Sequence, residues 1–185
     1  MNDTSGRNDT SGLNGNRRLF LDATVQHVLA AAALLVAEAA GAIDDERFDD
    51  WAQMFTDDCL YRITTRESRA KGWPIGLMHC DGAGMLRDRI LSMRHANIFE
   101  AHHYRHMGSA TRLAPGTKLA VDLSTGVHVH TNFELTRIMG NGEMALFATG
   151  FFDDVVVSSD QGLQFRERTV VLDSSRVDTL IVVPF

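Results

Sequence analysis

The sequence predicts an α+β domain in which three N-terminal helices pack against a curved antiparallel sheet. Two patterns support this prediction. In the first half of the chain, apolar residues recur at intervals of three and four, which is typical of helices that bury one side. Beyond His106, apolar and polar residues alternate in runs separated by turn signals, which is typical of strands. Helices grouped before strands favour an α+β architecture.

The helices are predicted from their apolar stripes and their ends. Apolar residues recur through residues 21–39, and the pattern ends at Gly41, a residue type that often terminates helices. Asp44 is expected to cap a short second helix. The third helix is expected within residues 85–97, behind the start signal at Gly82.

The strands are predicted from alternation and from turn residues. Residues 59–64 are expected to form the first strand, and residues 66–74 a loop that leads to the third helix. Asn141 and Gly142 are the strongest hairpin signal in the chain. Four later strands are expected at residues 105–113, 118–138, 143–157 and 163–172, with further reversals at Pro115 with Gly116 and Gln161 with Gly162, and an apolar, tied-down segment at 179–185.

Composition indicates one globular domain with a short tail. Residues 1–16 contain the polar sequence NDTSG twice, which can bury almost nothing, so we expect a disordered tail followed by a single domain over residues 17–185. The hydrophobic content of 44% and the charged content of 23% are ordinary for a globular protein. The net charge of -6 gives no indication of nucleic-acid binding.

Cysteine usage and hydropathy indicate the compartment. Cys59 and Cys80 are too few for a disulfide framework, so we expect free thiols in a reducing cytoplasm. Residues 28–40 are strongly apolar but contain Glu38, and they are shorter than the roughly 20 residues that a membrane span needs. We therefore expect a buried helix, no membrane partner and no signal peptide.

His128, His130 and Glu134 form the pattern that most resembles a metal site. His-x-His-x3-Glu is the spacing at which a cupin strand presents metal ligands, and the period of a strand places all three on one face. No histidine follows His130, so the further ligand of a cupin-like site is missing. We therefore predict a polar outer face, opposite a core face of Val127, Val129, Phe133 and Leu135, and no metal on this chain.

A second candidate for chemistry is an acid/base pocket. Asp57 or Asp58, Tyr61, and either His103 or His106 are the types of residue that move protons next to a carbonyl, if they meet inside a helix-lined sheet. Paired acids before a strand also occur as caps at helix ends, so both interpretations stay open. The chain contains no nucleophile elbow, P-loop, dinucleotide glycine pattern or CxxC motif.

Four parts of the chain carry a resemblance to a known family. They are WAQMFTDDCLYR at 51–62, MLRDRI at 85–90, NIFE at 97–100 with YRH at 104–106, and DTL at 178–180. These stretches resemble the small (β) subunits of Rieske non-haem iron aromatic-ring-hydroxylating oxygenases, with terephthalate dioxygenase and salicylate hydroxylase as the most similar subgroup. The order of elements also resembles the cone-shaped fold of nuclear transport factor 2, ketosteroid isomerase and scytalone dehydratase, the nuclear transport factor 2-like (cystatin-like) fold. The resemblance covers about residues 20–185.

The resemblance implies a subunit of an enzyme in which another chain carries the redox centres. The partner α subunit would carry a Rieske [2Fe-2S] cluster and mononuclear Fe(II), and electrons would come from NAD(P)H through a reductase. Cys59 and Cys80 agree with this division, because they lack the Cys-x-His and Cys-x-x-His spacings of a Rieske site. On this chain we expect no catalytic, cofactor-binding or metal-binding residues.

The resemblance also implies a structural role in an assembly. We expect a non-catalytic β subunit that supports α subunits in an α3β3 complex, acting on an aromatic acid in the cytoplasm. The candidate subunit contacts are polar strand positions near the histidine-dense segment. The alternative is a stand-alone isomerase or dehydratase with its own acid/base cavity. The contact candidates are Tyr104, Arg105, His106, His128 and His130.

Overall fold

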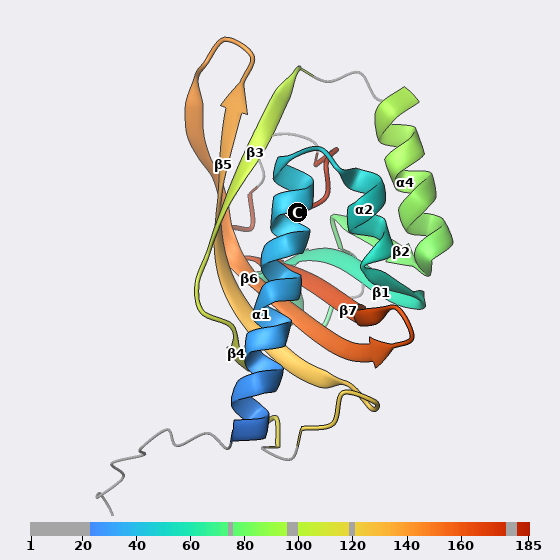
Figure 1. Ribbon diagram of the computed structural model, residues 1–185. Helices are drawn as coiled ribbons and strands as arrows, with labels where there is room; N and C mark the ends of the chain where they lie inside the picture. Colours follow the sequence, from blue (N-terminus) through green and yellow to red (C-terminus); the bar gives the residue numbers. More distant parts are fainter. Residues whose placement is uncertain (1–22, 74–75, 96–99, 119–120, 177–180) are drawn as a thin grey trace, which may run out of the picture.

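A computed structural model of the chain describes residues 23–73, 76–95, 100–118, 121–176 and 181–185 (Figure 1). The tail predicted at residues 1–16 lies outside the described residues. The elements, in chain order, are α1 (Ala23–Asp44), α2 (Phe48–Gln53), β1 (Phe55–Thr65), α3 (Arg66–Ala70), β2 (Met78–Asp81), α4 (Ala83–His95), β3 (His102–Gly108), β4 (Arg112–Leu113), β5 (Val127–Met139), β6 (Met144–Ser159) and β7 (Gly162–Leu172).

The strands form one curved sheet. Its order is β2-β1-β7-β6-β5-β3, and β4 pairs with β5 outside that path. All neighbours are antiparallel except β1 and β7, which run parallel with Tyr61 opposite Arg168. The prediction of an antiparallel sheet is wrong for this pair. A hairpin forces its two strands to be antiparallel, whereas β1 and β7 are joined through most of the chain and carry no such constraint.

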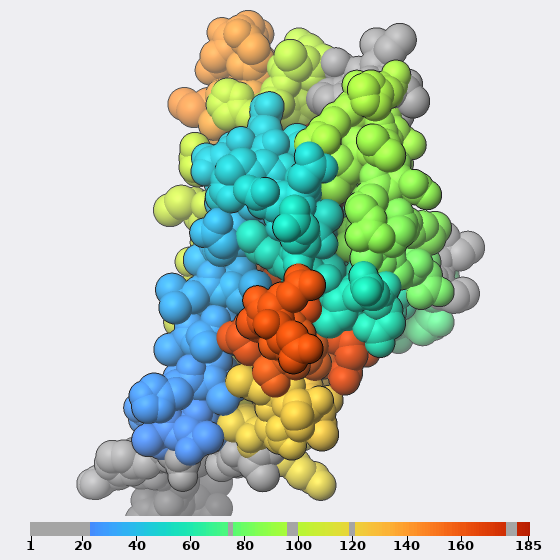
Figure 2. Space-filling view, turned by 45° about the vertical axis from the view of Figure 1, so that its right-hand side comes forward, coloured from blue at the N-terminus to red at the C-terminus, as the bar shows by residue number. Residues whose placement is uncertain are grey.

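Helices α1, α2 and α4 cover one face of the sheet (Figures 1 and 2). The stripe of α1 predicted from the sequence is buried there, and Ala39 and Ala42 have no exposed surface. In α4, Leu86, Ile90 and Met93 are buried, as its stripe predicts. By length and composition alone, α1 also passes the test for a membrane span, with a mean hydropathy of 1.6.

Two predictions about the helical half are wrong. Asp44 does not cap α2, because α1 continues to Asp44 and the residue before α2 is Arg47, which makes no side-chain cap. The loop predicted at residues 66–74 contains α3, which Thr65 caps by accepting a hydrogen bond from the backbone N–H of Ser68. Strand β2 was not predicted, because its four residues are too few to show a period.

The reversals in the second half are confirmed. Gly142 and Gly162 adopt positive φ angles of 87° and 109° between β5 and β6 and between β6 and β7, in a region that favours glycine. Strand β5 begins at Val127 rather than residue 118, because the preceding residues include the turn Asp122–Gly126 closed by backbone hydrogen bonds. The alternating pattern is confirmed at Val127, Val129, Phe133 and Leu135, which are buried.

Candidate functional site

The interior between the helices and the sheet contains residues 181–185 of the chain itself. Phe185 is 1% exposed and its backbone N–H donates to the hydroxyl of Tyr61 over 3.0 Å. The same hydroxyl donates to the backbone carbonyl of Phe185 over 3.3 Å. The ring of Tyr61 meets that of Trp51 edge-on at 5.2 Å. Burial strongly raises the pKa of Tyr61, so its hydroxyl stays neutral and serves as a structural donor and acceptor.

A buried ion pair joins β6 and β7 in the same interior. Arg168 donates from Nε and from an Nη to the two carboxylate oxygens of Asp154, each over 2.9 Å. Its guanidinium lies 3.9 Å from the centroid of the Phe165 ring. Burial raises the pKa of Asp154, and the charge of Arg168 opposes that shift. Removal of either partner would leave the other charge unpaired in the core and would strongly destabilise the fold, so we assign the pair a structural role.

The predicted acid/base set does not meet in one place. Asp57 and Asp58 are exposed on β1, while the hydroxyl of Tyr61 is occupied by Phe185. His103 is exposed on β3. His106 lies beside α1, with Nδ1 2.7 Å from Asp44 Oδ1 and its backbone N–H donating to the same carboxylate. The partner of His106 is therefore Asp44.

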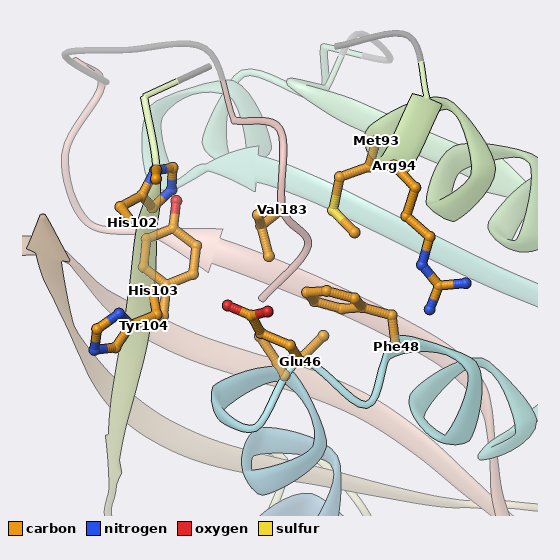
Figure 3. A pocket seen from close by; sticks show the side chains of 10 residues that line it. Glu46, Phe48, Met93, Arg94, His102, His103, Tyr104 and Val183 are labelled. Atoms are coloured by element: carbon orange, nitrogen blue, oxygen red, sulfur yellow. The ribbon is translucent and has the colours of Figure 1, made fainter. Parts of the chain in front are cut away.

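A pocket of about 380 Å³ lies at the open end of the interior, between the start of β3 and the end of α4 (Figure 3). Glu46 points its carboxylate into this pocket, opposite the ring of Tyr104 (Figure 3). Burial raises the pKa of Tyr104 to about 12, so its hydroxyl stays protonated near neutral pH and cannot serve as a base. Arg94, on the rim, is paired with Asp49. The pocket offers polar groups for binding, but its carboxylate has no histidine or lysine partner among the described contacts.

A cluster of two histidines and a carboxylate lies on the opposite face of the sheet. His128 Nε2 and His130 Nε2 lie 2.5 Å and 2.9 Å from the same atom, Asp153 Oδ1. Arg69, from α3, pairs with the other oxygen of Asp153. Burial lowers the pKa of His130, against the opposing effect of Asp153. For Asp153, burial favours the neutral form, but Arg69 and the two histidines outweigh it and lower its pKa.

This cluster corrects one expectation about the polar face of β5. His130 was predicted to meet water or a partner, but it is only 8% exposed, because the ring of Phe151 and the carboxylate of Asp153 cover it. His128 follows the prediction, with 45% of its side chain exposed. Glu134 is exposed farther along β5, opposite Thr149, and does not join the cluster.

The candidate subunit contacts differ in exposure. Arg105 and His128 present about half of their side chains to the surface, 56% and 45%. Tyr104 is buried against the ring of Phe147, and the side chain of His106 is 3% exposed. Their side chains are therefore not available on the surface. Among the five candidates, His128 and Arg105 are the exposed ones, and Arg105 also pairs with Asp44.

Sequence reasoning did not identify Asp44, Asp153, Asp154 or Arg69 as partners of these groups. Each lies on a different element from its partner, and spacing along one strand carries no information about a neighbouring element. The contact between Asp153 and His130 could have been found from the sequence, because the hairpin at Asn141 and Gly142 sets the register of β5 against β6.

Comparisons with known proteins identify the family of the chain. A family model described as "Ring hydroxylating beta subunit" matches residues 38–179. The chain is 38% identical over 144 residues to the anthranilate 1,2-dioxygenase small subunit of Burkholderia cepacia, which covers 78% of this chain and 86% of that protein. It is 36% identical over 148 residues to the terephthalate 1,2-dioxygenase terminal oxygenase component subunit beta 1 of Comamonas sp, covering 80% of this chain and 92% of that protein.

Solved structures show the same fold. A β-subunit structure from Novosphingobium aromaticivorans superposes with a TM-score of 0.76 and 28% identity, over 88% of this chain and 99% of that one. The β subunit of benzoate 1,2-dioxygenase from Burkholderia mallei superposes with a TM-score of 0.65 at 14% identity, over 84% of this chain and 97% of that one, and this likeness concerns the fold alone. The predicted nuclear transport factor 2-like fold is confirmed, and the chain belongs to the family of β subunits of ring-hydroxylating dioxygenases.

Proposed function

We propose that this chain is a non-catalytic β subunit that supports the assembly of oxygenase α subunits. The α subunit would carry the Rieske [2Fe-2S] cluster and mononuclear Fe(II), with electrons supplied from NAD(P)H through a reductase. The complex would be a cytoplasmic α3β3 assembly. Its substrate would be an aromatic acid, since two relatives are named for anthranilate and terephthalate.

The occupied interior supports a structural role. A stand-alone isomerase or dehydratase needs an open cavity with an acid and a base within reach of its substrate. Here Ile181, Val182 and Phe185 are at most 5% exposed within the core. Tyr61, the buried hydroxyl of the predicted acid/base set, is held by Phe185. This arrangement favours the subunit interpretation over the stand-alone enzyme.

The outer face of β3, β5 and β6 supports a subunit contact. Arg105 lies opposite Thr136, which lies opposite Leu146, so the three share one sheet face. Leu146 is 63% exposed, and Met107 and Met144 on the same face are 63% and 69% exposed. Large apolar side chains that gather on one exposed face are a common feature of protein interfaces. Arg105 begins on this face, but its guanidinium pairs with Asp44 of α1. We name the surface formed by Met107, Met144 and Leu146 the outer hairpin face and propose that a partner subunit covers it.

Expression of the α subunit with and without this chain tests the proposal. With the chain, we expect a soluble assembly that hydroxylates an aromatic acid when a reductase and NAD(P)H are supplied. Without it, we expect the α subunit to lose assembly and turnover together. A fully assembled and active α subunit in the absence of this chain would contradict the proposed role.

A further inference from the structure

The cluster of His128, His130 and Asp153 has a geometry that the assembly role does not require. All three donor atoms lie within 4.8 Å of one another. The two imidazole rings are nearly perpendicular, with an interplanar angle of 89°, and both Nε2 atoms point at one carboxylate oxygen. Two neutral imidazoles and one carboxylate that converge in this way form a donor set for first-row transition metals.

We propose that His128, His130 and Asp153 form a binding site for one divalent transition-metal ion, for which Zn²⁺ is the probe. The site is separate from the iron centres assigned to the α subunit, and it revises the expectation of a metal-free chain. That expectation rested on the absence of a histidine after His130 in the sequence. The structure supplies the third ligand from the neighbouring strand, because β5 and β6 place His130 opposite Asp153.

The surroundings orient the ligands as a metal site requires. Arg69 engages one oxygen of Asp153, so the other oxygen is turned toward both imidazoles. Such partners of a ligating carboxylate fix its direction and affect metal affinity. His130 and Asp153 are 8% and 7% exposed and lie on paired strands, so two of the three ligands are held in place. His128 Nε2 is 2.5 Å from the Asp153 oxygen, and because its side chain is 45% exposed it can move by the ~0.8 Å that would bring this distance to the ligand–ligand spacing of a tetrahedral zinc site.

The site is also accessible and has a second source of negative charge. His128 and Asp153 line a cleft of about 330 Å³, so coordination positions left open by the protein face solvent. Glu167 lines the same cleft and is aligned with His128 across Val155. Arg62 and Arg69 line the cleft as well, and the carboxylate of Glu167 offsets part of their charge. A cation with borderline preference for nitrogen and oxygen ligands fits this set better than Mg²⁺ or Ca²⁺, which prefer oxygen.

Calorimetric titration of the full, untagged chain with Zn²⁺ tests the site, after removal of bound metal by a chelator. We expect about one ion per chain. His128→Ala removes a half-exposed ligand and should leave the fold intact, which circular dichroism verifies. Because one of three protein ligands is lost, affinity should fall about tenfold or more. Asp153→Asn should weaken binding in the same direction. The matched control is His103→Ala, which removes an exposed histidine on β3 and should leave affinity unchanged.

Two results would overturn the proposal. One is a parent chain that takes up less than half an equivalent of Zn²⁺. The other is a His128→Ala chain that binds as tightly as the parent, which would show that Zn²⁺ binds elsewhere. Co²⁺ provides an independent readout, because its ligand-field absorption reports coordination by nitrogen and oxygen directly. With His128→Ala this absorption should require at least tenfold more Co²⁺ to appear. None of these measurements involves the α subunit, so their outcome is separate from that of the assembly experiment.

Discussion

The hydroxyl of Tyr61 is the most informative single group to remove. Tyr61→Phe deletes one oxygen and keeps the ring that packs on Trp51 and Phe55, so the change in core volume is small. It leaves the backbone N–H of Phe185 without the acceptor it has at 3.0 Å. A buried donor that loses its partner costs about 1–3 kcal/mol of unfolding free energy. For a chain of this length, a loss of about 2 kcal/mol corresponds to a melting temperature lowered by about 4–8 °C.

The assay is thermal unfolding of Tyr61→Phe beside a matched control. Tyr104→Phe removes the hydroxyl of another buried tyrosine, which makes no hydrogen bond within the described residues, so we expect a smaller shift. Hydrogen exchange adds a local readout, because residues 181–185 should lose protection before β5 and β6 do. Equal melting temperatures for the two variants, or unchanged exchange at residues 181–185, would refute the claim that Tyr61 holds this segment in the interior.

Three further predictions concern the core, the tail and the contact face. Arg168→Met should lower the free energy of unfolding by about 3–5 kcal/mol, because it leaves the charge of Asp154 unpaired in the core. The double variant with Asp154→Leu should recover much of this loss, and denaturant titration measures both variants. A single variant as stable as the double variant would contradict the buried ion pair. Deletion of residues 1–16 should leave the melting temperature unchanged in calorimetry, and a fall of several degrees would show that the tail packs. Leu146→Asp should reduce the amount of α subunit that co-purifies with the chain, at an unchanged melting temperature. Leu34→Asp alters an exposed leucine on α1 and should leave that amount unchanged. Equal yields of α subunit with the two variants would exclude the outer hairpin face as the contact.

Local patterns predicted α1, α2, α4, the late strands and their turns, because the burial of one side leaves a period in the sequence. The stripe of α1 and the alternation of β5 both follow this rule. Pairs between distant elements leave no such period. The parallel contact of β1 with β7 and the pairing of Asp44 with His106 join residues far apart in the chain, so spacing could not reveal them.

The histidine cluster could be predicted from the sequence in part. A two-residue turn at Asn141 and Gly142 places His130 opposite Asp153 when equal numbers of residues are counted away from the turn. The structure has this pairing, although a bulge between Leu135 and Thr136 shifts the register near the turn. The contact of His130 with Asp153 was therefore accessible from the sequence. The contribution of Arg69 was not, because α3 was expected to be a loop.

The measurement that most directly tests the central claim is purification of the affinity-tagged chain from its native host, followed by native mass spectrometry and iron analysis. Our account predicts that a larger subunit with bound iron and acid-labile sulfide co-purifies in equal amount, and that the complex has the mass of three copies of each. A chain that purifies without an iron protein, and that by itself isomerises or dehydrates a substrate, would contradict the account.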